Sequence, residues 1–280
     1  MKRALILSGG GSRGSFQVGV WKYLQEKNWY PDLICGTSIG AINAVAIGSG
    51  LTVQEIANIW RTSGSNRDKI YKLKIFDFLA NALFNRRLVP LMDTTPLKKM
   101  IQSAIDFNRL KQSKIEIVIS AVNLNTALPE FFNQHEITVD HIMASSAMPI
   151  IFSPQKIGQV SYWDGGIMAN TPILPALVYG ADEIIVVLLS PVGHQTGLPE
   201  PKKLMEAAEH LMEQSLASSY QATIMAQFFK IYSCKTPKII TIAPSKMLGI
   251  PSLLNFTQKQ ANLLMADGYK NACKELKNRL

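Results

Sequence analysis

The chain has 280 residues, of which 47% are hydrophobic and 18% charged, so it holds ample apolar sequence for the core of one large domain. Its three cysteines are an odd number and form no C-x-x-C pair, which argues against a disulfide-stapled scaffold, redox chemistry and structural zinc and favours a reducing compartment. A net charge of +9 suits anionic partners, but without zinc-finger spacing, an RNP-like aromatic run or a long basic helix we do not expect nucleic acid to be one of them.

The first 54 residues contain two apolar stretches that resemble targeting signals. After Met1-Lys2-Arg3 only residues 4–7 are apolar, far short of the apolar region of a signal peptide. Residues 33–54 carry no charge, but their glycine, serine, threonine and asparagine residues make a poor transmembrane helix. We therefore predict a buried strand followed by a buried helix, and a cytoplasmic protein that is at most peripheral to a membrane.

Short β-rich apolar runs alternate with helix-length segments along the chain. The expected strands cover residues 4–7, 33–35, 115–122, 183–189 and 239–242. The expected helices cover residues 14–26, 39–47, 53–61, 172–179, 204–232 and 258–277. This alternation predicts an α/β fold with a mostly parallel central sheet flanked by helices. We expect a single domain over residues 1–280, with a motif-bearing core at 2–190 and a helical C-terminal part at 200–280 that completes or caps it.

A glycine-rich stretch, S-G-G-G-S-R-G at residues 8–14, follows the first strand and opens a helix. Bare N–H groups at such a turn can hold a phosphate or a developing oxyanion. A dinucleotide site would need an acidic residue at the end of the second strand, whereas Asp32 lies at its start. A P-loop would need a lysine directly after Gly14, where Ser15 stands. The stretch alone is equally compatible with a tight strand-to-helix turn.

The sequence G-T-S-I-G at residues 36–40 stands between the second strand and a helix rich in glycine and alanine. In a nucleophile elbow, a serine on a sharp strand-to-helix turn is exposed above the sheet edge, and flanking glycines avoid a clash. Ser38 is therefore the candidate nucleophile, and Gly36 and Gly40 would support the elbow. The alternative is an ordinary helix N-cap serine.

A serine nucleophile needs a base. None of the four histidines, His135, His141, His194 and His210, lies in a tight motif. Asp164 stands out in the run Y-W-D-G-G, although Asp-Gly is also a favoured hairpin turn. Two arrangements remain: Asp164 acts alone as the base, or the serine works in an α/β-hydrolase-like triad with an aspartate (Asp164 or Asp182) and a histidine (His194 or His210).

Four motifs, taken in order, resemble those of the patatin-like phospholipases. They are S-G-G-G-S-R-G at residues 8–14, G-T-S-I-G at 36–40, A-S-S-A-M-P-I-I-F at 144–152 and D-G-G-I-M-A-N-T-P at 164–172. The resemblance spans about residues 2–189, with weaker echoes in T-P-L at 95–97 and D-G-Y at 267–269. Many members have an acidic residue where this chain has Ser8, a departure that concerns the local polar network rather than the catalytic pair.

The resemblance implies a three-layer α/β/α domain and a hydrolase of phospholipid or lysophospholipid esters that needs no histidine, cofactor or metal. Ser38 would be the nucleophile and Asp164 the base, supported by Gly36, Gly40, Gly165 and Gly166. The oxyanion hole would be formed by Gly9, Gly10, Gly11, Ser12, Arg13 and Gly14. We expect Arg13 to hold the loop, to attract a phosphate head group or to form a structural salt bridge. A non-catalytic nucleotide- or lipid-binding module built on the glycine loop is the alternative from another functional class.

Residues 61–99 carry nine basic and three acidic residues, mixed with large apolar ones. Such a pattern is typical of a segment that lies on an anionic membrane or covers an acyl groove. The alternative is an amphipathic helix packed on the sheet with a solvated basic face. We expect a lipid ester as substrate and a transient contact with anionic membrane through this segment; the sequence does not indicate an oligomeric state.

Overall fold

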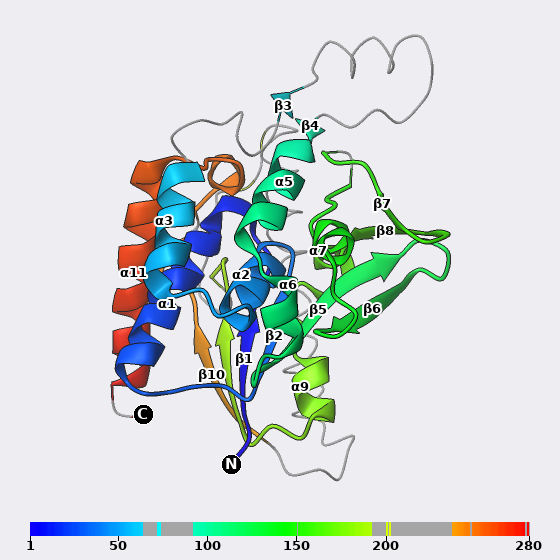
Figure 1. Ribbon diagram of the computed structural model, residues 1–280. Helices are drawn as coiled ribbons and strands as arrows, with labels where there is room; N and C mark the ends of the chain where they lie inside the picture. Colours follow the sequence, from blue (N-terminus) through cyan, green and yellow to red (C-terminus); the bar gives the residue numbers. More distant parts are fainter. Residues whose placement is uncertain are drawn as a thin grey trace.

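The computed structural model describes residues 1–63, 72–73, 92–149, 151–191, 200, 202, 237–246, 248–277 and 279. At its centre lies a sheet with the strand order β10-β9-β1-β2-β5-β8-β7, in which β6 also pairs with β5 (Figure 1). The parallel strands are β1 (Arg3–Leu7), β2 (Leu33–Thr37), β5 (Glu116–Asn123), β9 (Glu183–Val187) and β10 (Lys238–Ile242). The antiparallel strands are β6 (Leu128–Asn133), β7 (Gln155–Ile157) and β8 (Val160–Asp164), and a separate pair is formed by β3 (Lys72–Leu73) and β4 (Met92–Asp93). The predicted α/β fold with a mostly parallel sheet is confirmed.

Helices follow most of the strands. They are η1 (Gly11–Gly14), α1 (Ser15–Glu26), α2 (Ile39–Gly48), α3 (Val53–Ser63), α5 (Thr95–Ala104), α6 (Phe107–Lys111), α7 (Val139–Ser145), α8 (Gly166–Ala169), α9 (Leu174–Val178), η3 (Ile250–Leu253) and α11 (Gln258–Leu276). The expected helix at 14–26 thus begins with a 3₁₀ turn, and the one at 172–179 is shorter than predicted. The expected helix at 204–232 lies outside the described residues. Among the helices that are described, none is both long and apolar enough to cross a bilayer.

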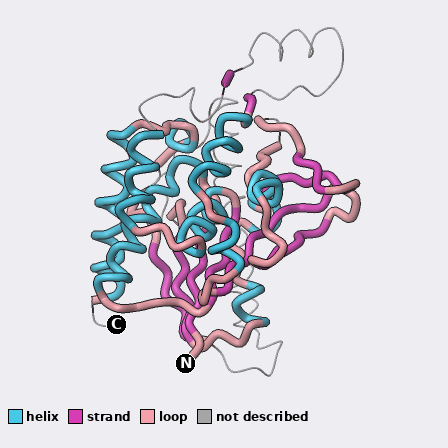
Figure 2. Tube along the Cα trace, viewed as in Figure 1, coloured by secondary structure: helices cyan, strands magenta, loops and turns pink. Residues whose placement is uncertain are grey.

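The central strands read as continuous apolar runs because both faces of the sheet are buried. In β1, Leu5 and Leu7 face the core shared with α1, α2, α3 and α11, whereas Ala4 and Ile6 face the core beside α9. This alternation follows from the two-residue period of a strand. Figure 2 shows the parallel strands in the middle of the molecule, with long helices along one flank and the antiparallel strands toward the other.

Two glycines allow α1 and α11 to pack closely against each other. A Cβ atom on Gly268 would meet the backbone of Phe16, and one on Gly19 would meet the backbone of Met265. Beside this crossing, Tyr269 donates a hydrogen bond to Glu26 at 2.6 Å. The D-G-Y sequence at 267–269 therefore has a packing role, which joins the C-terminal helix to the first helix (Figure 1).

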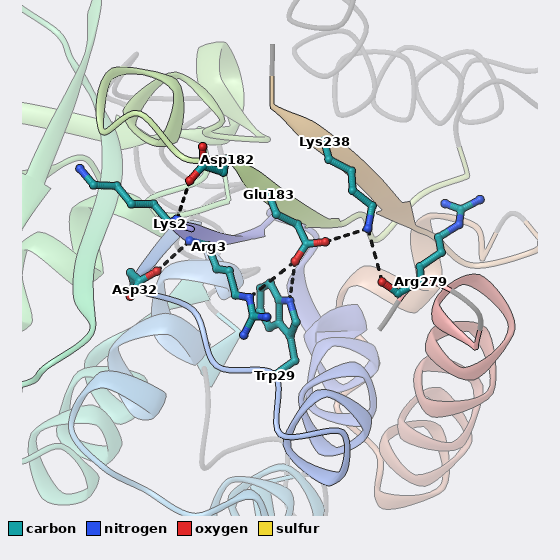
Figure 3. Close-up of polar contacts among 8 residues, drawn as sticks. All are labelled: Lys2, Arg3, Trp29, Asp32, Asp182, Glu183, Lys238 and Arg279. Carbon is teal, nitrogen blue, oxygen red and sulfur yellow. Dashed lines mark hydrogen bonds and ion pairs between the residues drawn. The ribbon is translucent and has the colours of Figure 1, made fainter. Parts of the chain in front are cut away.

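A polar cluster closes the edge of the sheet at which the parallel strands begin (Figure 3). The buried carboxylate of Glu183 accepts hydrogen bonds from Trp29 Nε1 and Lys238 Nζ, both at 2.9 Å. Arg3 Nε lies 3.7 Å from the same carboxylate. Burial opposes ionisation, but these hydrogen bonds and the charges of Lys238 and Arg3 outweigh it and lower the pKa of Glu183.

We expect Glu183→Gln to lower the free energy of unfolding at pH 7 by about 1–3 kcal/mol, because charged hydrogen bonds are lost from a buried site. Because the pKa of Glu183 is lower in the folded than in the unfolded state, its ionised carboxylate stabilises the fold at pH values above the unfolded-state pKa of about 4.3. This contribution is lost as the pH falls through the folded-state pKa. The difference between wild type and variant should therefore shrink below about pH 4. Urea unfolding at several pH values measures it, with the more exposed Glu275→Gln as the control. An equal loss at all pH values would contradict the electrostatic explanation.

Candidate active site

The glycine-rich loop passes directly behind Ser38. A Cβ atom on Gly9 would lie 3.1 Å from the Cβ of Ser38. Gly11 has a φ of 57° and its α-carbon faces the backbone carbonyl of Leu253, so that both its conformation and its surroundings require glycine. The first hydrogen bond of η1 runs from Arg13 N to Gly10 O, which leaves the N–H groups of Gly11 and Ser12 without an acceptor inside the helix.

Ser38 occupies the turn between β2 and α2 in a strained conformation, with φ 55° and ψ −121°. A Cβ atom on Gly40 would clash with the carbonyl of Leu7, and one on Gly36 would clash with Gly40. Ser38 stands at the N-cap position of α2, but its side chain makes no capping hydrogen bond, so it is not an ordinary N-cap serine. Ser38 N donates instead to Ser145 Oγ at 2.9 Å, which fixes the turn from the side of α7. These features are those of a nucleophile elbow.

Sheet register brings Asp164 to the serine. Thr37 lies opposite Ser120 in the parallel pair of β2 and β5, and Ala121 lies opposite Asp164 in the antiparallel pair of β5 and β8. The residue after Thr37 and the last residue of β8 therefore lie at the same level on either side of β5. Ser38 and Asp164 line the same cavity, and the interaction with the Ser38 hydroxyl favours the ionised form of the Asp164 carboxyl by lowering its pKa.

The Asp-Gly pair at 164–165 lies between β8 and α8, so the hairpin-turn interpretation of this sequence is wrong. Gly165 packs against the backbone of Ser120, where a Cβ atom would lie 2.6 Å from its carbonyl oxygen. Gly166 N donates to Asp164 Oδ1 at 2.7 Å. The two glycines thus let the chain leave the sheet closely enough to hold the carboxylate in place.

Asp164 is buried, with 4% of its surface exposed. Burial raises the pKa of Asp164 to about 6, although the hydrogen bonds from Ser38 and Gly166 act in the opposite direction. This carboxylate is consequently a stronger base than an ordinary aspartate and is still mostly ionised at neutral pH.

Ser38 and Asp164 lie in the wall of a cavity of about 130 Å³. Its apolar lining comes from α2, α3, α5, the segment 148–152 and the segment 253–256: Ile39, Ile42, Ala46, Ile56, Ile59, Trp60, Leu97, Met100, Ile101, Ala104, Ile105, Met148, Ile151, Phe152, Leu253, Leu254 and Phe256. Its other described lining residues are Gly11, Asn43, Ser63 and Ser146. An acyl chain matches such a lining because it offers only apolar surface.

Of the loop residues predicted for an oxyanion hole, Gly11 lines this cavity and Gly9 adjoins Ser38, whereas Gly14 packs against Ile39 and Trp60. Arg13 is fully buried and donates to Ser252 Oγ at 2.7 Å, Ser190 Oγ at 2.9 Å and Gly249 O at 2.9 Å. The side chain thus holds the loop, which is one of the roles expected for it. Ser8 accepts a hydrogen bond from Leu189 N at 3.1 Å. Its hydroxyl thus takes part in the local polar network at the position where many family members have an acidic residue.

Of the two aspartates considered for a triad, Asp164 lies beside Ser38 and Asp182 does not. Asp182 precedes β9 and accepts a hydrogen bond from Lys2 N at 2.8 Å, at the edge where the strands begin (Figure 3). Five strand residues separate this edge from Ser38, a distance of about 16 Å. Asp182 is therefore wrong as a triad member. His141 bonds to Thr138 in a helix cap, and His135 lies in the turn after β6; His194 and His210 lie outside the described residues, as does most of the basic segment 61–99.

Three contributions to the site were not predicted from the sequence. Ser145 holds the backbone of Ser38, Ser120 bonds to Thr37 at 2.5 Å, and residues 249–260 pack on the glycine loop. The run A-S-S-A-M-P-I-I-F at 144–152 is the sequence pattern from which the contribution of Ser145 could have been predicted. It supplies Ser145 to the elbow and Met148, Ile151 and Phe152 to the cavity.

The sequence profile of the patatin-like phospholipase family matches residues 5–177. The chain is 30% identical over 195 residues to the cGAMP-activated phospholipase of Vibrio cholerae serotype O1, covering 61% of this chain and 55% of the relative. It is 29% identical over 189 residues to the probable lipid hydrolase 463L of Invertebrate iridescent virus 6, covering 63% and 64%. The chain thus spans about half the length of the cGAMP-activated phospholipase. Among solved structures, VipD from Legionella pneumophila matches 99% of this chain and 66% of its own with a TM-score of 0.52 and 15% identity, a likeness of fold alone.

Proposed function

The chain belongs to the patatin-like phospholipase family, and from this premise we propose that it hydrolyses carboxylic esters of phospholipids or lysophospholipids through Ser38 and Asp164. The observation that carries the proposal is that Ser38, on a strained strand-to-helix turn, and the buried Asp164 carboxylate lie together in the wall of an apolar cavity. The raised pKa of that carboxylate supports its use as a base without a histidine. The names of the relatives, a phospholipase and a probable lipid hydrolase, agree with the substrate class.

In the proposed reaction, Ser38 Oγ attacks the ester carbonyl carbon as its proton passes to Asp164. Backbone N–H groups of Gly10, Gly11 and Ser12 stabilise the negative charge on the carbonyl oxygen. The intermediate collapses to an acyl-serine, and the departing alcohol takes the proton from Asp164. Water then attacks the acyl-serine and gives a proton to Asp164. The second collapse releases the fatty acid and returns this proton to Ser38.

The apolar lining supports binding of the acyl chain, and the net charge of +9 supports transient contact with an anionic membrane. We place this contact in the basic segment 61–99 and the enzyme in the cytoplasm, at most peripheral to a membrane. No further ligand is required, because a dyad of this kind carries out both proton transfers itself.

Hydrolysis of p-nitrophenyl butyrate and of phospholipid vesicles by the wild type tests the proposed function. We expect each of the variants His135→Ala, His141→Ala, His194→Ala and His210→Ala to keep its activity within about threefold, because the proposed base is a carboxylate. A fluorophosphonate should label Ser38. Loss of activity in one folded histidine variant would replace the dyad by a triad. A wild type that neither hydrolyses the two substrates nor accepts the label would instead support the binding-module alternative.

A further inference from the structure

A short segment outside the region that matches the family profile lies directly on the glycine loop. The segment, residues 249–256, includes η3, and the carbonyl of Leu253 occupies the space beside the α-carbon of Gly11. Leu253, Leu254 and Phe256 also line the cavity, and the Phe256 ring stacks on Trp60 with 6.0 Å between the ring centroids. This segment therefore contacts both the loop and the space proposed for the acyl chain.

Hydrogen bonds tie the segment to two successive loop residues. Ser12 Oγ donates to the carbonyl of Ser252. Arg13 Nε donates to Ser252 Oγ at 2.7 Å, and Arg13 Nη2 donates to Gly249 O at 2.9 Å. Because Ser12 and Arg13 are both buried, a change in these bonds would be transmitted to the backbone of η1 rather than absorbed by solvent.

One side chain of the C-terminal helix contacts both the loop and the segment. Gln260, in the first turn of α11, donates through Nε2 to Ser12 Oγ at 2.9 Å and to Ser252 O at 2.8 Å. Its Oε1 accepts a hydrogen bond from Asn255 Nδ2 at 2.6 Å, which fixes the orientation of the amide. The amide nitrogen thus faces the two oxygens that set the position of Ser12.

We propose that Gln260 is a positioning residue that holds Ser12, and with it the N–H groups at the start of η1, in the orientation that stabilises the oxyanion. The inference rests on the proposed function and assigns a role to the C-terminal part of the chain. Gln260 touches neither Ser38 nor Asp164 in the contacts described above, so it would act on the rate through the loop alone. Oxyanion donors are effective only when held in place before the reaction, and a displacement of about 1 Å can cost up to a hundredfold in rate.

Kinetics of Gln260→Ala with p-nitrophenyl butyrate test this role. We expect kcat to fall about 10- to 100-fold with KM changed less than twofold, because the loop acts on the transition state rather than on substrate binding. The apparent pKa of the acid limb should stay at the wild-type value, since Asp164 is untouched. Ser12→Ala should show the same pattern. The double variant should be no slower than the slower single variant, because both changes remove one shared contact. The exposed neighbour Lys259→Ala is the matched control.

Hydrogen exchange gives a readout that does not depend on activity. In Gln260→Ala the amides of residues 9–14 should exchange faster, while those of residues 33–45, which hold the elbow, should not change. Unchanged exchange at 9–14, or faster exchange with an unchanged kcat, overturns the proposal. A wild type without hydrolase activity overturns the proposed function and the catalytic part of this inference together, whereas exchange still shows whether Gln260 holds the loop. Gln260→Glu, which keeps the shape but loses the amide donors, should behave like Gln260→Ala.

Discussion

Asp164→Asn should lower the rate of ester hydrolysis at least about a thousandfold and, at pH 8, should make the folded protein more stable. The rate falls because an amide cannot accept the proton of Ser38. Stability rises because the ionised carboxylate of Asp164 is buried at a cost, which the raised pKa of about 6 expresses. Hydrolysis of p-nitrophenyl butyrate and urea unfolding of the same preparation measure the two effects.

The sign of the stability effect follows from the direction of the pKa shift. A carboxyl whose pKa is higher in the folded than in the unfolded state favours folding at low pH, and this contribution is lost as the pH rises through the folded-state value, here about 6. The shift from 3.8 to about 6 corresponds to at most about 3 kcal/mol. We therefore expect a gain of about 1–3 kcal/mol for Asp164→Asn at pH 8 that becomes small near pH 4. In the wild type, kcat/KM should rise with pH and level off above an apparent pKa near 6.

Asp182→Asn is the matched control, because this carboxylate lies at the far edge of the sheet and bonds to Lys2 N. It should keep full activity and should show no gain in stability at pH 8. If Asp164→Asn kept more than a tenth of the wild-type rate, Asp164 would not be the base. If it were inactive but less stable than the wild type at pH 8, the buried charge would not be costly and another cause would be needed for the pH dependence.

The central part of the fold could be predicted from the sequence because its strands are buried on both faces. Residues such as Ile184 and Ile185 in β9 face opposite cores, and so the strand reads as an uninterrupted apolar run. The antiparallel strands β6, β7 and β8 have no such signal. In β6 every side chain is partly or fully exposed, and β7 has only three residues, so neither apolar continuity nor alternation marks them.

The geometry of the candidate site could be predicted from the sequence where it depends on neighbouring residues, and not where it depends on distant parts of the chain. The elbow at Ser38 can be recognised from five consecutive residues, because the same turn requires the glycines on either side of the serine. The Asp-Gly pair at 164–165 is locally typical of a hairpin, and only the register of β2, β5 and β8 brings Asp164 to Ser38. No pattern in the sequence links Gln260 to Ser12, because 248 residues separate them and the contact arises from the packing of α11 beside α1.

Ser38→Gly should abolish hydrolysis, as should Ser38→Ala, with losses of at least about 10⁴-fold, because either change removes the nucleophile. The two variants should differ in stability. The backbone at residue 38, with φ 55° and ψ −121°, lies in a region that glycine adopts readily and that costs other residues about 1–3 kcal/mol. Part of this gain is offset by the greater freedom of glycine in the unfolded chain. We expect Ser38→Gly to be about 1 kcal/mol more stable than Ser38→Ala in urea unfolding.

Ser49, at the other end of α2, provides the matched pair of control variants. It is buried like Ser38, but its φ of −74° is one that every residue adopts. Ser49→Gly should therefore be about 0.5–1 kcal/mol less stable than Ser49→Ala, the reverse of the order at residue 38. The same order at both positions would mean that the elbow carries no strain. Opposite orders would show that the surrounding structure imposes a strained backbone conformation on Ser38. The position of the serine beside the cavity would then reduce the stability of the fold.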